Sequence, residues 1–225
     1  MTIDDIYIRT IEDLENAVTE LGFLPFFENS LPGFSIEEHV DPGIWFRTDD
    51  GPWEWKGPVI NELNCAYGKF FEKKAAYISP EWFPDFANYR RNGYDFDARF
   101  DDGLVFHGDK VLYDLIDNNA PVLSKRLKYL GNYRKGGNKG FDTIINRLQS
   151  QGYVLISDFR YMIDKNGNEY GWGVAEYSTP EHFMGNSFTD SVYSRTPEES
   201  FEKMVEHFHR ILPYIDENRI RTFLK

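Results

Sequence analysis

The sequence predicts an α+β protein in which a winged-helix unit packs against an aromatic-rich N-terminal α/β module and a C-terminal helix. Apolar residues recur at helical spacing in several segments, and short aromatic or β-branched runs are bounded by turn signals. The second half of the chain is typical of three helices followed by a hairpin, the element order of a winged helix. We expect an N-terminal module at 1–103, a winged-helix unit at 104–185 and a C-terminal helical segment at 186–225.

Composition limits the class of protein further. The chain has 225 residues, of which 41% are hydrophobic and 17% aromatic, enough for a substantial core. Its single cysteine, Cys65, excludes an internal disulfide and favours a reducing compartment. No apolar run approaches the roughly 18 residues that a membrane helix needs, and the N-terminus shows no signal-peptide pattern. We therefore predict a cytoplasmic protein without a membrane segment; no nucleotide-binding motif is present, and we predict no cofactor.

Local signals predict the elements of the N-terminal module. Residues 10–21 are expected to form a helix, capped by Thr10 with Asp13 three residues later and ended by Gly22. The alternating stretch 51–59, if extended, would place Trp53 and Trp55 on one face.

Two strands and a helix are expected to follow. The strands, 65–71 and 74–79, surround a turn at 72–74. The helix over 79–91 would be capped by Ser79 and have Pro80 at its first position.

An acidic connector follows at 92–103 and contains four aspartates. Their oxygens could hold a hard cation, but Arg99 occupies a position where a calcium loop needs a ligand. We favour a solvated connector and predict no metal site; the aspartates are Asp95, Asp97, Asp101 and Asp102.

The second half of the chain gives the clearest pattern. Asn166–Gly167 is a strong hairpin turn signal, and Ser124 and Thr196 are candidate helix caps. The expected elements are helices at 109–119, 122–130, 141–152 and 196–212, and hairpin strands at 153–159 and 170–178.

Positive charge is concentrated in one part of an acidic chain. The formal net charge is −12, yet residues 125–147 contain seven of the 25 basic residues and a single acid, Asp142. An acidic protein repels nucleic-acid phosphates, so any DNA binding has to be local. This segment is the only long candidate for a DNA-binding surface.

In a helix-turn-helix, the second helix of the motif enters the major groove, which here would be 140–151. Asn, Gln and Arg form paired hydrogen bonds to base edges, and a basic glycine-containing turn lets backbone amides approach phosphates. The predicted DNA-contacting residues are Lys125, Arg126, Arg134, Lys135, Lys139, Thr143, Asn146, Arg147 and Gln149. The competing interpretation is a solvated basic face on a winged helix that binds protein or nothing.

Three stretches resemble the AlkZ-like winged-helix DNA glycosylases. The first, "KAAYISPEWFPDFANYRR", is similar to a strand leading to a helix with Trp, Pro and a terminal Arg. The runs "LSKRLKYLG…GFDTIINRLQSQGYVLISDF" and "YGWGVAEYSTPEHF" are similar to that family's central winged helix. The resemblance implies a DNA partner and a relation to enzymes that excise alkylated or cross-linked bases.

The catalytic motif of that family, Gln-x-Gln or Gln-x-Asp near the first helix, is missing from the best counterpart, "LGFLPFFENS". The motif positions fall on Pro25 and Phe27, which cannot orient a water molecule. Glu28 and Asn29 lie beside them, and a carboxylate can activate water. We therefore expect a DNA-binding protein without this chemistry, with an active glycosylase and a protein-interaction module as alternatives.

Other candidate sites have simpler interpretations. An aromatic set could stack a flipped base, but an aromatic core is favoured; the set is Trp53, Trp55, Trp82 and Tyr67. His207 and His209 are two residues apart on a predicted helix and would not share a metal. Cys65 is expected to be an unreactive small residue.

Overall fold

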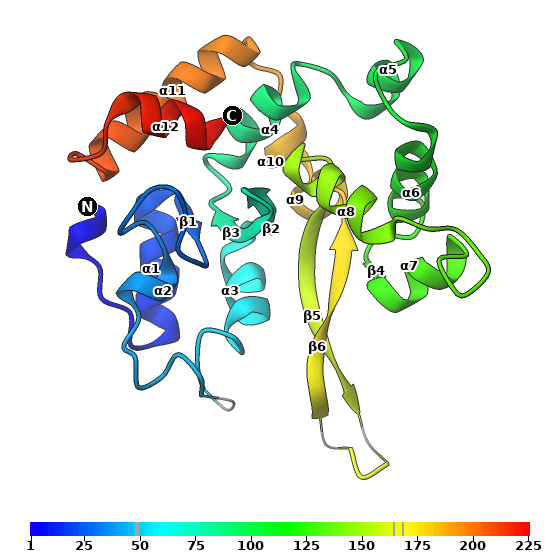
Figure 1. Ribbon diagram of the computed structural model, residues 1–225, viewed down its shortest axis with the longest axis horizontal. Helices are drawn as coiled ribbons and strands as arrows, with labels where there is room; N and C mark the ends of the chain where they lie inside the picture. The colour runs from blue at the N-terminus through cyan, green and yellow to red at the C-terminus, as the bar shows by residue number, and fades with distance from the viewer. Residues whose placement is uncertain (48–49, 164, 168) are drawn as a thin grey trace.

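The computed structural model has mixed α and β structure with two small antiparallel sheets (Figure 1). It describes residues 1–47, 50–163, 165–167 and 169–225. The strand orders are β1-β3-β2 and β4-β6-β5. The predicted α+β class is confirmed.

The strands are β1 (Phe23–Pro25), β2 (Ala66–Phe71), β3 (Lys74–Ile78), β4 (Val122–Leu123), β5 (Leu155–Ile163) and β6 (Glu169–Ser178). The helices of the first half are α1 (Ile11–Leu21), α2 (Ile36–His39), α3 (Lys56–Leu63), α4 (Phe83–Arg91) and α5 (Phe96–Asp101). Those of the second half are α6 (His107–Asp117), α7 (Ser124–Leu130), α8 (Phe141–Ser150), α9 (Pro180–Met184), α10 (Asn186–Thr189), α11 (Pro197–Ile211) and α12 (Glu217–Leu224).

The first helix and first hairpin follow their sequence signals. Thr10 caps α1 and exchanges hydrogen bonds with Asp13, and Gly22 ends the helix with a φ of 72°. Between β2 and β3, Glu72 and Lys73 both have positive φ, as a tight hairpin turn requires. These predictions are confirmed.

The stretch 51–59 is not extended. The N–H of Trp55 donates to the carbonyl of Gly51 (3.1 Å) in a turn, and α3 begins one residue later. Pro58 suits the first helical turn, where no backbone donor is needed. The alternation of rings and charges therefore did not reflect a strand.

The helix expected from Ser79 begins four residues later, at Phe83. The N–H groups of Trp82 and Phe83 donate to the carbonyl of Ser79 (3.1 and 3.0 Å), which forms a turn ahead of α4. The Ser79 side chain does not cap the helix. The connector at 92–103 also contains a short helix, α5, capped by Asp95.

The second half has the predicted order of three helices and a hairpin. α6, α7 and α8 precede β5 and β6, and the Asn166–Gly167 turn joins the two strands. The two-residue strand β4 pairs with β6 and was not predicted. Ser124 is the first residue of α7 and makes no capping hydrogen bond, so its predicted role as a cap is wrong.

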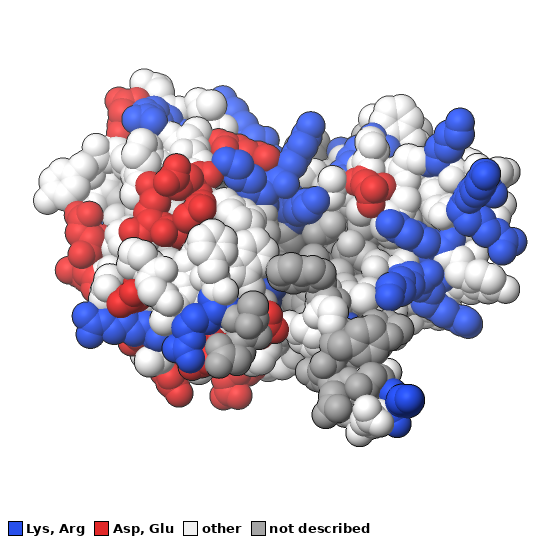
Figure 2. Space-filling model, turned by 60° about the horizontal axis from the view of Figure 1, so that its bottom comes forward, with Lys and Arg blue, Asp and Glu red and all other residues white. Residues whose placement is uncertain are grey.

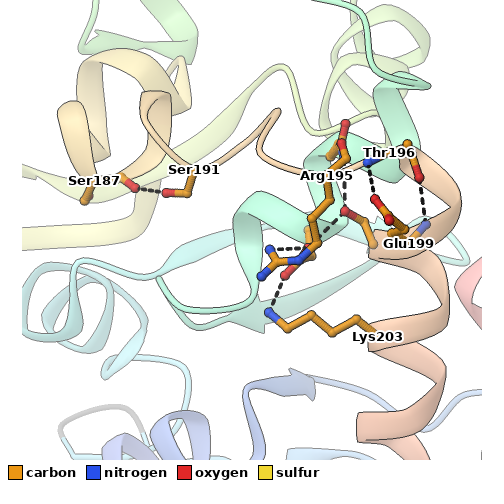
Figure 3. Close-up of polar contacts among 9 residues, drawn as sticks. Ser187, Ser191, Arg195, Thr196, Glu199 and Lys203 are labelled. Atoms are coloured by element: carbon orange, nitrogen blue, oxygen red, sulfur yellow. Dashed lines mark hydrogen bonds and ion pairs between the residues drawn. The ribbon is translucent and has the colours of Figure 1, made fainter.

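The last long helix, α11, begins as predicted. Thr196 and Glu199 exchange hydrogen bonds at its N-terminus (Figure 3). Farther along, Lys203 donates to the carboxylate of Asp85 on α4 (2.6 Å), and Ser200 donates to the same carboxylate (2.9 Å). Asp85 is almost fully buried, so these contacts fix α11 against α4.

A second buried charge on α4 faces the other half of the chain. Arg91 is 1% exposed and donates to Glu181 (2.8 Å), to the hydroxyl of Tyr193 (3.0 Å) and to the carbonyl of Gly152 (2.7 Å). These partners belong to α9, the loop before α11 and the turn after α8. Arg91 therefore joins the N-terminal segment to the C-terminal half.

Replacing Arg91 with methionine is expected to destabilise the protein by about 3–5 kcal/mol, because it leaves Glu181 and a buried carbonyl without their donor. The measurement is denaturant-induced unfolding. Arg221→Ala is the control, since Arg221 also pairs with two carboxylates, Glu202 and Glu217, but at the surface. If the control loses as much unfolding free energy as the Arg91 variant, the role of Arg91 in joining the two parts of the chain is contradicted.

His207 on α11 is held neutral by its surroundings. Its ring stacks on Trp82 (centroids 4.0 Å apart), and its Nε2 donates to the carbonyl of Leu21 (2.8 Å). Burial lowers the pKa of His207, with the nearby charges of Arg210 and Lys203 acting in the same direction. The folded state therefore binds a proton on His207 less readily than the unfolded chain does.

Stability should consequently fall as the pH decreases from about 7.5 to about 5.5, since protons bind preferentially to the unfolded state. In the variant His207→Gln this slope should be smaller. His107→Gln, at an exposed position, is the control and should retain the slope. Unfolding free energies measured across this pH range test the prediction, and an unchanged slope in His207→Gln would refute it.

Candidate nucleic-acid interface and a polar pocket

Five basic side chains form what we call the basic end. They belong to α7 and to the loop between α7 and α8, and all are exposed: Lys125, Arg126, Arg134, Lys135 and Lys139. Figure 2 shows Lys and Arg side chains gathered at the end of the molecule where Figure 1 places α7 and this loop. The basic run of the sequence therefore forms a local surface.

Carboxylates do not neutralise the basic end. Across 1–47, 50–163, 165–167 and 169–225, no ion pair involves any of its five residues. Arg134 donates to the side chain of Asn132 (3.0 Å) and lies over the ring of Tyr129, which is 63% exposed. The neighbouring Lys128 lies 3.7 Å from Asp142, itself largely exposed.

The loop of the basic end is held by its own backbone. Gly136 and Gly140 have φ values of 83° and 86°, and a Cβ at Gly137 would lie 2.1 Å from the carbonyl of Asn132. The N–H of Asn138 donates to that same carbonyl (2.8 Å). The glycines thus permit a tight loop that presents its basic side chains outward.

The predicted base-reading residues of α8 differ in their exposure and in their partners. Thr143 is exposed and Asn146 is partly exposed. Arg147 makes two hydrogen bonds to the buried carboxylate of Asp109 (2.6 and 2.7 Å).

The outward orientation predicted for Gln149 is wrong. It is 1% exposed, donates to the carbonyl of Ile145 and accepts from the N–H of Lys69 on β2 (3.1 Å). Its side chain therefore fixes α8 to the first sheet, so it is not available to DNA.

A polar pocket that the sequence analysis missed lies against one face of the second sheet. Its volume is about 340 Å³. Asp158 and Glu176 lie directly opposite each other on β5 and β6, and Arg160 lies two residues beyond Asp158. Other lining residues include Asn61 of α3, His182 and Phe183 of α9, and Pro121.

Charged side chains interact around this pocket. Nη2 of Arg160 lies 3.1 Å from Asp158, whereas its Nε is 3.8 Å from Glu176. Nε2 of His182 lies 3.2 Å from Asp117. The signal in the sequence was the pair of charges, Asp158 and Arg160, inside the otherwise uncharged strand β5.

The comparisons with known proteins give one positive result. The sequence profile described as "AlkZ related" matches residues 8–225, nearly the whole chain. The chain belongs to the AlkZ-related family. Searches of curated proteins and of solved structures found no match.

The residues that the sequence analysis compared with the AlkZ catalytic motif have structural roles in this AlkZ-related chain. Pro25 ends β1, and the ring of Phe27 packs against Phe26 and other rings. The side chain of Asn29 makes hydrogen bonds with three backbone groups nearby. Glu28 is exposed. Asn29 therefore shapes a loop, and Glu28 is not held in an enclosed site.

The aromatic residues considered for base stacking belong mainly to the core, as favoured. Trp55, Trp82 and Tyr67 are at most 5% exposed, and Trp53 packs against Phe26 at the edge of the same cluster. These rings are therefore not free to stack a flipped base.

The acidic connector is tied into local structure. Asp95 caps α5, and Asp97 lies 3.4 Å from Lys110. No group of three potential metal ligands occurs in the described part of the chain, and no helix there could cross a membrane. His207 and His209 have separate partners, the carbonyl of Leu21 and the carboxylate of Glu217.

Cys65 is fully buried, and burial raises the pKa of its thiol to about 12. Because the thiolate is the reactive form, a thiol reagent at about pH 8 should not modify the native protein. It should modify the protein rapidly in guanidinium chloride, which serves as the positive control. Labelling is measured by the absorbance of the chromophore that the reagent releases. Rapid labelling of the folded protein would contradict the burial of Cys65.

Proposed function

We propose that this AlkZ-related protein binds DNA through its basic end. The observation that supports the proposal is a group of five exposed cations, none of which has a carboxylate partner in the described part of this chain of net charge −12. Outside residues 125–147 the chain carries 18 basic and 36 acidic residues, so the rest of the protein repels phosphates. A local cationic surface is therefore where a polyanion would bind.

We also propose that residues 104–185 form a winged-helix unit. The order of α6, β4, α7, α8, β5 and β6, with β4 beside β6, is consistent with that motif. In this arrangement α8 would enter the major groove and the loop before it would lie along the phosphates. Thr143 and Asn146 would face the bases.

The binding mode would depend mostly on the DNA backbone. Phosphate contacts position a protein without reading sequence. On α8, the side chain of Gln149 is buried against β2 and cannot contact a base. The exposed ring of Tyr129, beside Arg134, supplies a surface on which an unpaired base could stack. We expect weak sequence preference and a preference for distorted or partly unpaired DNA.

The family relation raises the question of base excision. The positions that correspond to the family's catalytic motif, Pro25 and Phe27, carry no group that could activate water. Incubation of the protein with alkylated DNA, followed by alkali, would reveal abasic sites. Strand breaks at the level of an active control glycosylase would overturn the view that this chemistry has been lost.

Salt dependence tests the DNA interface. If four or five phosphates are contacted, log affinity should fall with log salt at a slope of roughly −4. Replacing Arg134, Lys135 and Lys139 with alanine should reduce the magnitude of that slope by about 3, with little change in melting temperature. Fluorescence anisotropy with labelled duplex DNA measures both.

The matched control removes three cations from other exposed positions, Arg9, Lys69 and Lys225. It changes the net charge equally and should leave most of the affinity intact. Equal losses in the two triple variants would show that overall charge, and not the basic end, governs binding. Absence of duplex binding at about 50 mM salt would count against DNA and favour the protein-interaction alternative.

A further inference from the structure

The pocket between α3, α9 and the second sheet contains an uncommon arrangement of charge. Asp158 and Glu176 are opposite residues on neighbouring antiparallel strands, and the side chain of each is only 13% exposed. Like charges in this position repel and weaken a strand pair. Among the described residues, their one basic partner is Arg160, which is 62% exposed. Departures from local folding rules of this kind are concentrated at functional sites.

Glu176 in particular has unused hydrogen-bonding capacity. Its separation from Nε of Arg160, 3.8 Å, is too long for a hydrogen bond. Within the described part of the chain no side chain or backbone N–H donates to its carboxylate. The carboxylate lines the pocket, so it can accept hydrogen bonds from the N–H groups of a ligand bound there.

The position of Asp158 is fixed by close packing. Its Oδ1 accepts from the N–H of Phe159 (2.7 Å), and a Cβ added to Gly57 of α3 would come within 2.8 Å of the same oxygen. The first turn of α3 therefore approaches the carboxylate closely because residue 57 is glycine. This packing holds Asp158 in place before any ligand binds.

The lining selects the chemistry of the ligand. Ionised carboxylates only accept hydrogen bonds, so Asp158 and Glu176 select a partner that presents N–H donors. Phe183 and Pro121 supply apolar surface that suits a flat ring. The volume of about 340 Å³ falls in the range of small-ligand sites. Anionic ligands are disfavoured by the carboxylates.

We propose that this pocket binds a nucleobase carrying an exocyclic amine, with Asp158 and Glu176 accepting its N–H groups. This proposal rests on the proposed DNA function, because that function is the reason for choosing nucleobases over other heterocycles that carry an amino group. Carboxylates are known acceptors for the amino group of cytosine. Cytosine, guanine and adenine qualify, whereas uracil has a carbonyl oxygen in place of the amine of cytosine and hypoxanthine has a hydrogen in place of the amine of guanine.

Two pairs of free nucleosides test the proposal without DNA. Cytidine and uridine differ at the amine, as do guanosine and inosine. In titrations of the ¹⁵N-labelled protein, the amides of Asp158, Arg160 and Glu176 should shift with cytidine and guanosine. Affinity for uridine and inosine should be at least about tenfold weaker, the cost of losing hydrogen bonds to a charged acceptor. Cytidine 5′-monophosphate should bind more weakly than cytidine.

The variants Asp158→Asn and Glu176→Gln keep the side-chain shape and add a donor, so each should abolish the preference for amino-bearing bases. Glu20→Gln, on an exposed face of α1, is the matched control and should behave as the unmodified protein. Melting temperatures verify that all three remain folded. No shift with any nucleoside at about 10 mM, equal binding of cytidine and uridine, or an unchanged preference in both pocket variants would overturn the proposal.

Failure of this proposal is distinguishable from failure of the DNA interface. Nucleoside titrations report only on the pocket, and the salt dependence of duplex binding reports only on the basic end. Phosphate-driven DNA binding without nucleoside selectivity would remove the pocket assignment alone.

Discussion

The arrangement of the chain depends on two opposite charges buried on α4. Asp85 binds Lys203 of α11, and Arg91 binds Glu181 of α9 together with the carbonyl of Gly152 after α8. Burial alone would lower the pKa of Arg91, but the charge of Glu181 raises it overall, so the guanidinium stays ionised. An ionised group in this place requires its partners, and they come from segments distant in sequence. These contacts join α4 to α9, to α11 and to the turn after α8.

The same principle determines which polar groups are left for function. Arg147 and Gln149 look like base-reading residues in a linear sequence, yet the fold uses both internally, against Asp109 and Lys69. The cations of the basic end have no such carboxylate partners in the described part of the chain. The distinction between a structural and an available cation is therefore set by tertiary partners and not by residue type.

This distinction explains how far the sequence could predict the molecule. Local signals were sufficient where a cap or a turn residue acts within a few positions, as at Thr10, Thr196 and the Glu72–Lys73 turn. They failed at 51–59, where a turn and a helix replaced an apparent strand, and at Gln149, whose burial depends on β2. The pocket was missed because its residues come from α3, α9 and two strands. Only the fold brings them together.

The basic end and the pocket would contribute different parts of recognition. Contacts to phosphates give affinity that is insensitive to sequence. Of the predicted base-reading residues on α8, Thr143 is exposed and Asn146 is partly exposed. A buried acceptor site discriminates more sharply, because a ligand without the matching donor leaves the carboxylates unsatisfied. If the basic end binds DNA through phosphates, chemical selectivity would therefore have to come from a separate site such as the pocket around Asp158 and Glu176.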